Sequence, residues 1–205
     1  MIKKLALVTG AVSLLFGGCL SSIIPEPAPA ATIYRLSVPG EAVRPSPDAV
    51  ALRLDRPSAP KSLLGQSIVV SPDGQRLASA SGAKWSQSIP ALIQYSFYDV
   101  LSRRQAIEAI LPASGARSEY RAHLTLRNFE AQFDQGESAA PLAIVEYTVT
   151  VAKSATRDLI GTRTIRKTAR AAGPNVSYIV DAQNRANQDA LNDIADWIES
   201  LEIDS

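Results

Sequence analysis

The sequence is poor in the side chains that bind metals or form crosslinks. Its 205 residues include one cysteine, one histidine and one methionine. A single cysteine cannot close a disulfide within the chain, and one cysteine with one histidine cannot complete a four-ligand zinc site of the usual kind. We therefore expect no metal centre, no cofactor and no disulfide framework.

An excess of one charge is also missing. Lysine and arginine number 21 and aspartate and glutamate 20, which gives a formal net charge of +1. Nucleic-acid-binding domains usually carry a clear basic excess, so we expect no nucleic acid among the partners. Hydrophobic residues make up 46% of the chain and charged residues 20%. This balance is typical of one globular domain with a core of its own.

Catalytic motifs are missing as well. The chain has no H-E-x-x-H, G-x-S-x-G, P-loop or G-x-G-x-x-G pattern. Two S-x-x-K patterns begin at Ser58 and Ser81, but both fall in segments that we predict to be loops, without the S-D-N and K-T-G elements of penicillin-recognising enzymes. We interpret the only histidine, His123, as a solvated residue on the polar side of a strand. The sequence favours a protein that is not an enzyme.

Carboxylates keep one enzymatic alternative open. Glycoside hydrolases use two carboxyl groups roughly 5–10 Å apart, a distance that spacing along the sequence does not report. The candidate residues lie on predicted strands and turns: Glu119, Glu130, Asp134, Glu137 and Glu146. We expect them to lie on a solvated surface.

The first 18 residues have the features of an export signal. Lys3 and Lys4 precede an apolar run over residues 5–16, which is shorter than the ~20 helical residues needed to cross a bilayer. The four residues from Phe16 to Cys19, FGGC, resemble the bacterial lipobox. This resemblance implies cleavage before Cys19 by signal peptidase II and lipid attachment to its sulfur. The alternative is a buried thiol in the tail of an ordinary signal peptide.

A tether follows the proposed anchor. Residues 21–31, SSIIPEPAPAA, are rich in proline and alanine and show no periodicity, which favours an extended chain of about 3.1 Å per residue. Leu20 is not the aspartate that resembles an inner-membrane retention signal, so we expect the outer membrane, on the periplasmic side. We divide the chain into a signal peptide (1–18), an acylated cysteine with its tether (19–31) and one periplasmic domain (32–205).

A hairpin leading into a helix organises the first half of this domain. Residues 67–71 are rich in β-branched side chains, a Pro-Asp-Gly break follows at 72–74, and a second strand is predicted over 75–80. From residue 86 to 101 the apolar period becomes helical. The apolar stripe of this predicted helix consists of Ile89, Leu92, Ile93, Phe97, Val100 and Leu101.

The remaining pattern predicts the fold class. Strands are expected over 32–38, 49–54 and 105–111, an antiparallel meander over 119–133, 142–153 and 159–169, and a second helix over 177–201. This order predicts an α+β two-layer sandwich, with a mixed, mainly antiparallel sheet and two long helices packed on one face. No predicted helix covers the other face. Apolar residues there would require cover by a loop or another chain.

Several short motifs resemble one known family. In chain order they are Cys19, Tyr34-x-Leu36, the hairpin from Val69 to Leu77, Gly82-Ala83-Lys84-Trp85, Pro90 in the helix, and Tyr120 followed by Leu124, Leu126 and Phe129. Together they resemble the PqiC-like ABC-type transport auxiliary lipoproteins over residues 32–201. The resemblance implies a lipid-anchored, non-enzymatic partner of an MCE-type system. Its partners would be a periplasmic MCE-domain protein and an ABC permease with its ATPase.

Three functions stay open at this point. The first is an adaptor that docks such a transport complex, which the resemblance implies moves lipids or other hydrophobic molecules. The second is a module that itself carries a lipid and needs an apolar pocket of several hundred Å³. The third is a carboxylate-dependent envelope hydrolase. We expect Trp85 and Trp197 to be core residues, assign only Cys19 a functional role, as the lipid attachment site, and leave assembly into homo-oligomers open.

Overall fold

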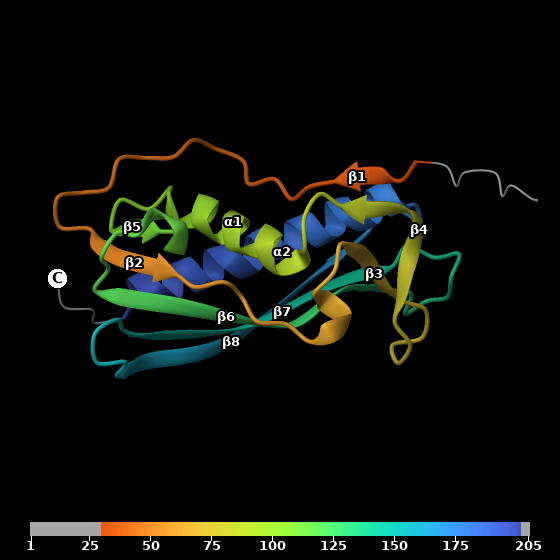
Figure 1. Cartoon of the computed structure of the whole chain (residues 1–205). Helices are drawn as coiled ribbons and strands as arrows, with labels where there is room; N and C mark the ends of the chain where they lie inside the picture. The colour runs from red at the N-terminus through yellow and green to blue at the C-terminus, as the bar shows by residue number, and fades with distance from the viewer. Residues whose placement is uncertain (1–29, 202–205) are drawn as a thin grey trace, which may run out of the picture. The chain divides into compact units, whose positions relative to one another are not determined.

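Three long strands joined by short turns form the centre of the structure. The computed structural model describes residues 30–201 of the chain. In it β6 (Tyr120–Gln132), β7 (Leu142–Lys153) and β8 (Leu159–Arg170) pair antiparallel in chain order (Figure 1). Buried and exposed side chains alternate along β6, because successive residues of a strand point to opposite faces. The predicted three-stranded meander is confirmed.

Five shorter strands extend this meander into an eight-stranded mixed sheet. They are β1 (Thr32–Tyr34), β2 (Val50–Leu54), β3 (Ser67–Ser71), β4 (Ala78–Trp85) and β5 (Ile107–Ile110). β2 and β3 each join β6 in parallel, and β5 adds in parallel to β2. β4 pairs antiparallel with β3 and takes β1 as a parallel neighbour. The longest pairings of the sheet are therefore the antiparallel ones of β6, β7 and β8.

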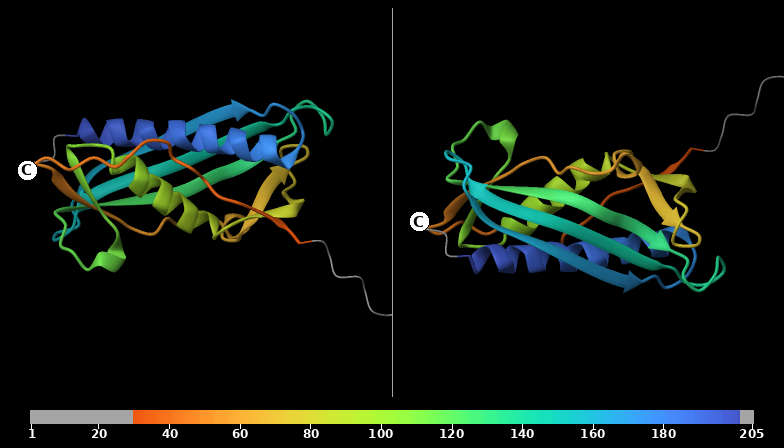
Figure 2. Two further views of the ribbon diagram at one scale, coloured as in Figure 1. Left: turned by 90° about the horizontal axis from the view of Figure 1, so that it is seen from above. Right: turned by 90° about the horizontal axis from the view of Figure 1, so that it is seen from below.

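The two helices, α1 (Ile89–Leu101) and α2 (Val176–Glu199), lie together on one face of the long strands (Figures 1 and 2). α1 carries Pro90 in its first turn, where a missing N–H leaves no helical bond unmade. α2 contacts β7 and β8 and also packs against α1. Seen from below in Figure 2, the strands present their other face with no helix over it. This confirms the predicted α+β architecture with both helices on one side.

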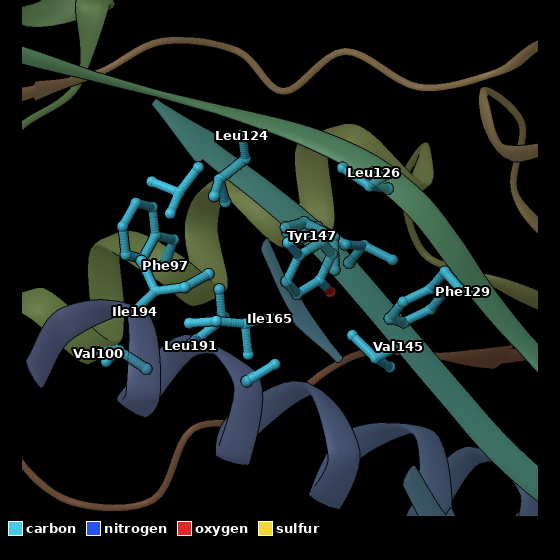
Figure 3. Packing of buried hydrophobic residues seen from close by; sticks show 14 of the residues in the cluster. Phe97, Val100, Leu124, Leu126, Phe129, Val145, Tyr147, Ile165, Leu191 and Ile194 are labelled. Atoms are coloured by element: carbon cyan, nitrogen blue, oxygen red, sulfur yellow. The ribbon is translucent and has the colours of Figure 1, made fainter. Parts of the chain in front are cut away.

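The hydrophobic core fills the space between this helical layer and the sheet. Figure 3 shows side chains of α1, α2 and the three long strands meeting there. They include Phe97, Val100, Leu124, Leu126, Phe129, Val145, Tyr147, Ile165, Leu191 and Ile194, all buried. Trp85 is fully buried, with its ring centroid 5.9 Å from that of Phe129, so it is a core residue as predicted. Trp197 is partly buried against the same core.

The second arm of the first hairpin begins later than predicted. β4 covers Ala78–Trp85, whereas the sequence pattern predicted residues 75–80. The reason is Asp73, whose Oδ1 accepts hydrogen bonds from the backbone N–H groups of Gln75 at 3.0 Å and Arg76 at 2.8 Å, so the turn extends past the glycine. The prediction that the S-x-x-K pattern from Ser81 lies in a loop was wrong, because it lies within β4.

The first strand is shorter than predicted. β1 ends at Tyr34, and the chain then leaves the sheet and runs over α2 (Figure 1). Side chains of the helix bind the backbone of Ser37: Gln188 Nε2 donates to its carbonyl at 2.6 Å, and its N–H donates to Asn184 Oδ1 at 3.2 Å. The alternation of residues 32–38 thus reports partial burial against the core rather than strand pairing.

A buried polar contact lies inside the α2 and sheet interface. Tyr147 Oη donates to Asn187 Oδ1 at 2.7 Å, and both side chains are fully buried. Burial raises the pKa of Tyr147 well above its usual value, so the hydroxyl stays protonated and can donate. One helical turn away, the amide of Gln183 is also fully buried, and neither its nitrogen nor its oxygen has a hydrogen-bond partner among residues 30–201.

Replacing Tyr147 with phenylalanine tests this contact. Tyr147→Phe leaves the Asn187 amide oxygen buried without a donor, and we expect the free energy of unfolding to fall by about 1–3 kcal/mol in urea denaturation. Gln183→Met is the matched control, because it replaces two unpaired polar atoms with an apolar chain of similar length and should raise the stability. Equal stability of all three proteins would contradict this account.

Candidate functional site

The predicted lipid attachment site lies outside the described residues. Cys19, the signal peptide and most of the tether precede residue 30, where the description of the structure begins. Within residues 30–201, neither helix is both long and apolar enough to span a bilayer. The same range contains no cluster of three or more histidine, cysteine or acidic residues that could hold a metal ion. Candidate sites are therefore sought on the surface of the folded domain.

The face of the long strands that carries no helix is polar. Threonines pair across it: Thr148 Oγ1 lies 2.9 Å from Thr164 Oγ1, and Thr150 Oγ1 lies 3.3 Å from Thr162 Oγ1. β6 adds Thr125 to the same face. Hydroxyl groups are satisfied by each other and by water, so this face needs no further layer. The sequence left open whether this face carries apolar residues that a loop or another chain would have to cover. The long strands carry polar side chains there instead.

His123 lies on this polar face, as predicted, but it has a partner that the sequence did not indicate. Its Nε2 is 3.0 Å from Ser58 Oγ, which is also 3.1 Å from Thr125 Oγ1. A serine beside a histidine is the start of a nucleophile and base pair, which usually needs a third group to orient the imidazole. No carboxylate of residues 30–201 is hydrogen-bonded to the other ring nitrogen.

Ser58 also has a structural role at this point. Its N–H donates to the carbonyl of Leu124 at 2.9 Å, and its carbonyl accepts from the N–H of Leu126 at 2.8 Å, so the loop residue forms a parallel bridge with β6. The hydroxyl then lies beside Thr125 and His123 because the backbone holds it there. This geometry favours a role in closing the edge of β6, where β2 and β3 leave a gap between them.

Two of the candidate carboxylates, Glu130 and Glu146, lie on the polar face of adjacent strands, whereas Glu119 precedes β6 and Asp134 and Glu137 lie in the turn after it. Asp134 receives a hydrogen bond from Arg170 Nη2 at 2.8 Å, which helps hold its pKa below the usual range, and Glu146 Oε2 receives one from Arg166 Nη1 at 3.1 Å. Glu130 is half-buried, and this burial raises its pKa. Glu119 and Glu137 are exposed. The four clefts described below are each lined by at most one carboxylate.

One of these clefts stands out by its charge. It has a volume of about 550 Å³ and lies where the turn between β7 and β8 meets the loop before β6. We call it the arginine cleft; its lining residues are Arg53, Ala116, Arg117, Ser118, Arg121, Ser154, Ala155 and Arg157. Arg53 and Arg121 come together because β2 and β6 pair in parallel with these two residues in register.

The other three clefts differ in size and position. Two open hollows of about 490 and 360 Å³ flank the loops around residues 108–116 and 153–156. The third, between β2 and the end of α2, is lined mostly by apolar side chains such as Leu52, Ile107 and Ile198, and its volume is about 90 Å³. Pockets that shelter drug-sized or larger ligands measure roughly 300–1,000 Å³. This hollow next to the core is too small to enclose a lipid.

Comparison with known proteins identifies one family and several solved structures of similar fold. A family model described as an ABC-type transport auxiliary lipoprotein component matches residues 34–195. Among solved structures, a protein from Xanthomonas campestris has a TM-score of 0.70 at 21% identity, covering 82% of this chain and 94% of that one. A hypothetical protein from Chlamydia trachomatis has a TM-score of 0.53 at 7% identity, covering 75% and 97%. These identities show a shared fold alone. No curated protein matches.

The raised pKa of Glu130 predicts a pH-dependent stability. The carboxyl group titrates near 4.5 in the unfolded chain and at higher pH in the folded one, because burial penalises its charge. The resulting stability is complete below pH 4.5 and is lost as the pH rises through the folded pKa. We therefore expect Glu130→Gln to unfold at higher urea concentration than the wild type at pH 7, with the difference shrinking toward pH 4.

Glu137→Gln provides the control for this experiment, since Glu137 is exposed in the turn between β6 and β7. It should follow the wild type at both pH values. A difference between Glu130→Gln and the wild type that is the same at pH 4 and pH 7 would show that the charge of Glu130 is not its cause.

Proposed function

We propose a function from the premise that this chain belongs to the ABC-type transport auxiliary lipoproteins, whose family model spans residues 34–195. The chain acts as a lipid-anchored, non-enzymatic docking subunit of an envelope transport system. Acyl chains on Cys19 hold it at the periplasmic side of the outer membrane. Its folded domain docks a periplasmic MCE-domain protein, which works with an ABC permease and ATPase to move lipids or other hydrophobic molecules.

The observation that carries this proposal is the extent of the family match. It runs from the last residue of β1 into the last two turns of α2, so it covers both layers of the domain rather than one motif. Two structural features support it. The core between the layers is filled by side chains, and its adjoining hollow of about 90 Å³ leaves no room for a carried lipid. None of the four clefts described for the domain is lined by two carboxylates.

A tethered domain contributes position rather than chemistry. Residues 21–31 would reach on the order of 30 Å if extended at ~3.1 Å per residue. Attachment at one end keeps the domain close to its partner. The effective concentration of the domain at the partner then depends on the length of the tether. Two or more acyl chains give a stable anchor, whereas a single chain would bind a membrane only marginally. The lipid and the tether together set where the partner can be held.

Replacement of the predicted acylated cysteine tests the anchor. We expect Cys19→Ser to move the protein from the membrane to the soluble fraction, and globomycin, which inhibits signal peptidase II, to block processing of the wild type. Ser21→Ala changes a neighbouring hydroxyl without touching the thiol and should leave the protein in the outer-membrane fraction of a density gradient. Unchanged fractionation of Cys19→Ser would refute lipid anchoring at this residue.

Co-purification tests the docking role. We expect the wild-type chain, captured from detergent-solubilised envelope, to bring down an MCE-domain protein, with an ABC permease and ATPase. The soluble Cys19→Ser protein should capture less of the same partner from intact cells after crosslinking, because it has lost the local concentration that the anchor provides. Equal capture by both proteins would argue against positioning by the tether, and no capture by either would argue against docking.

A further inference from the structure

Four guanidinium groups line the arginine cleft, and they come from four separate segments. Arg53 belongs to β2, Arg117 to the loop before β6, Arg121 to β6 and Arg157 to the turn between β7 and β8. Like charges gathered in one hollow repel each other, and the repulsion is only partly screened by solvent. Such a cluster is easiest to explain if a negative group balances it.

One carboxylate supplies part of that balance. Asp55 Oδ2 accepts hydrogen bonds from Nε of Arg121 at 2.7 Å and from Nη2 of the same side chain, and Asp55 Oδ1 lies 3.4 Å from Nε of Arg53. The Asp55 side chain is only 10% exposed. It therefore fixes the orientation of the two strand arginines, and its single negative charge pairs with only two of the four positive charges that line the cleft.

The other two arginines are unpaired. Among residues 30–201, the guanidinium groups of Arg117 and Arg157 have no hydrogen-bond or ion-pair partner, although both line the cleft. Two hydroxyl groups also line the cleft: Ser118 Oγ is 3.1 Å from Ser154 Oγ, which links the loop before β6 to the turn after β7. The cleft is thus lined by two unpaired guanidinium groups and by two hydroxyl groups.

The backbone at Arg157 adds a separate observation. Its φ of 66° lies in the left-handed region, which favours glycine or asparagine, and it is the only residue other than glycine with a positive φ in the described part of the chain. The turn is closed by hydrogen bonds from Arg157 N–H to the Lys153 carbonyl at 3.0 Å and from Lys153 N–H to the Asp158 carbonyl at 2.9 Å. An arginine thus occupies the turn position where glycine would fold with less strain.

We infer that the arginine cleft binds a phosphate group, either as a free ion or on the headgroup of a lipid. Arginine forks form paired hydrogen bonds with phosphate oxygens, and the tetrahedral group can accept from several arginines at once. The cleft volume of about 550 Å³ leaves space for substituents on the phosphate. This inference concerns a ligand site of the folded domain and does not depend on the proposed docking role.

The position of the cleft separates it from the tether. Arg121 lies at the start of β6, whereas β1, which follows the tether, pairs with the strand that carries Trp85, and Trp85 packs on Phe129. Eight residues of β6 separate Arg121 from Phe129, which corresponds to roughly 26 Å along the strand. β1 and the start of β6 lie toward opposite ends of the domain (Figure 1). A phosphate in the cleft is therefore held away from the point where the tether enters.

Titration of the full chain with inorganic phosphate at low ionic strength, followed by calorimetry, tests the site. We expect saturable binding that Arg117→Ala and Arg157→Gly each weaken at least tenfold. Arg157→Gly should keep or raise the melting temperature, because glycine suits the left-handed backbone. Arg127→Ala, on an exposed arginine of β6 outside the cleft, removes the same charge and should leave the affinity within twofold.

Dihexanoyl phosphatidic acid below its micelle concentration distinguishes the two sources of phosphate. Binding at least tenfold tighter than that of inorganic phosphate would identify a lipid headgroup as the ligand, and equal binding would identify the free ion. The inference is overturned if neither compound binds saturably. It is also overturned if Arg127→Ala weakens binding as much as Arg157→Gly does, since general charge rather than the cleft would then be responsible.

Discussion

The packing of α2 against the long strands is the contact on which the rest of the structure depends. The helix turns a stripe of alanines toward the sheet, with Ala182, Ala186 and Ala190 fully buried. Small side chains let the helix backbone approach the strands closely, and the larger groups of the sheet fill the space between turns. The hydrogen bond from Tyr147 to Asn187 Oδ1 lies inside this interface. The other layer elements, α1 and the segment after β1, pack around this contact.

One-sided packing decides where the chemistry-bearing residues lie. Both helices cover the same face. The opposite face therefore carries threonines, His123 and Glu146, which is ion-paired with Arg166. This face offers hydrogen-bonding groups in rows along the strands. The arginine cleft lies at one end of this face, where the loops that close the sheet bring four cations together.

These features agree with a protein that works by position and recognition. The domain belongs to a family of transport auxiliary lipoproteins and has a filled core. The proposed anchor precedes β1, and the proposed phosphate site lies at the start of β6, so the two would be points of attachment at different places on one sheet. β6 extends from the cleft toward the β1 end of the domain, and it pairs antiparallel with β7 from Tyr120 to Gln132.

Local periodicity in the sequence determined the elements that are regular over many residues. The alternation over residues 119–133 and the helical stripe from Ile89 to Leu101 predicted β6 and α1, because each side chain there reports its own face. Only the tertiary structure decided the contact of Ser58 with His123 and the gathering of Arg53 and Arg157 at one cleft. These residues come from segments far apart in the chain, and parallel pairing onto β6 leaves no local pattern that specifies its partner.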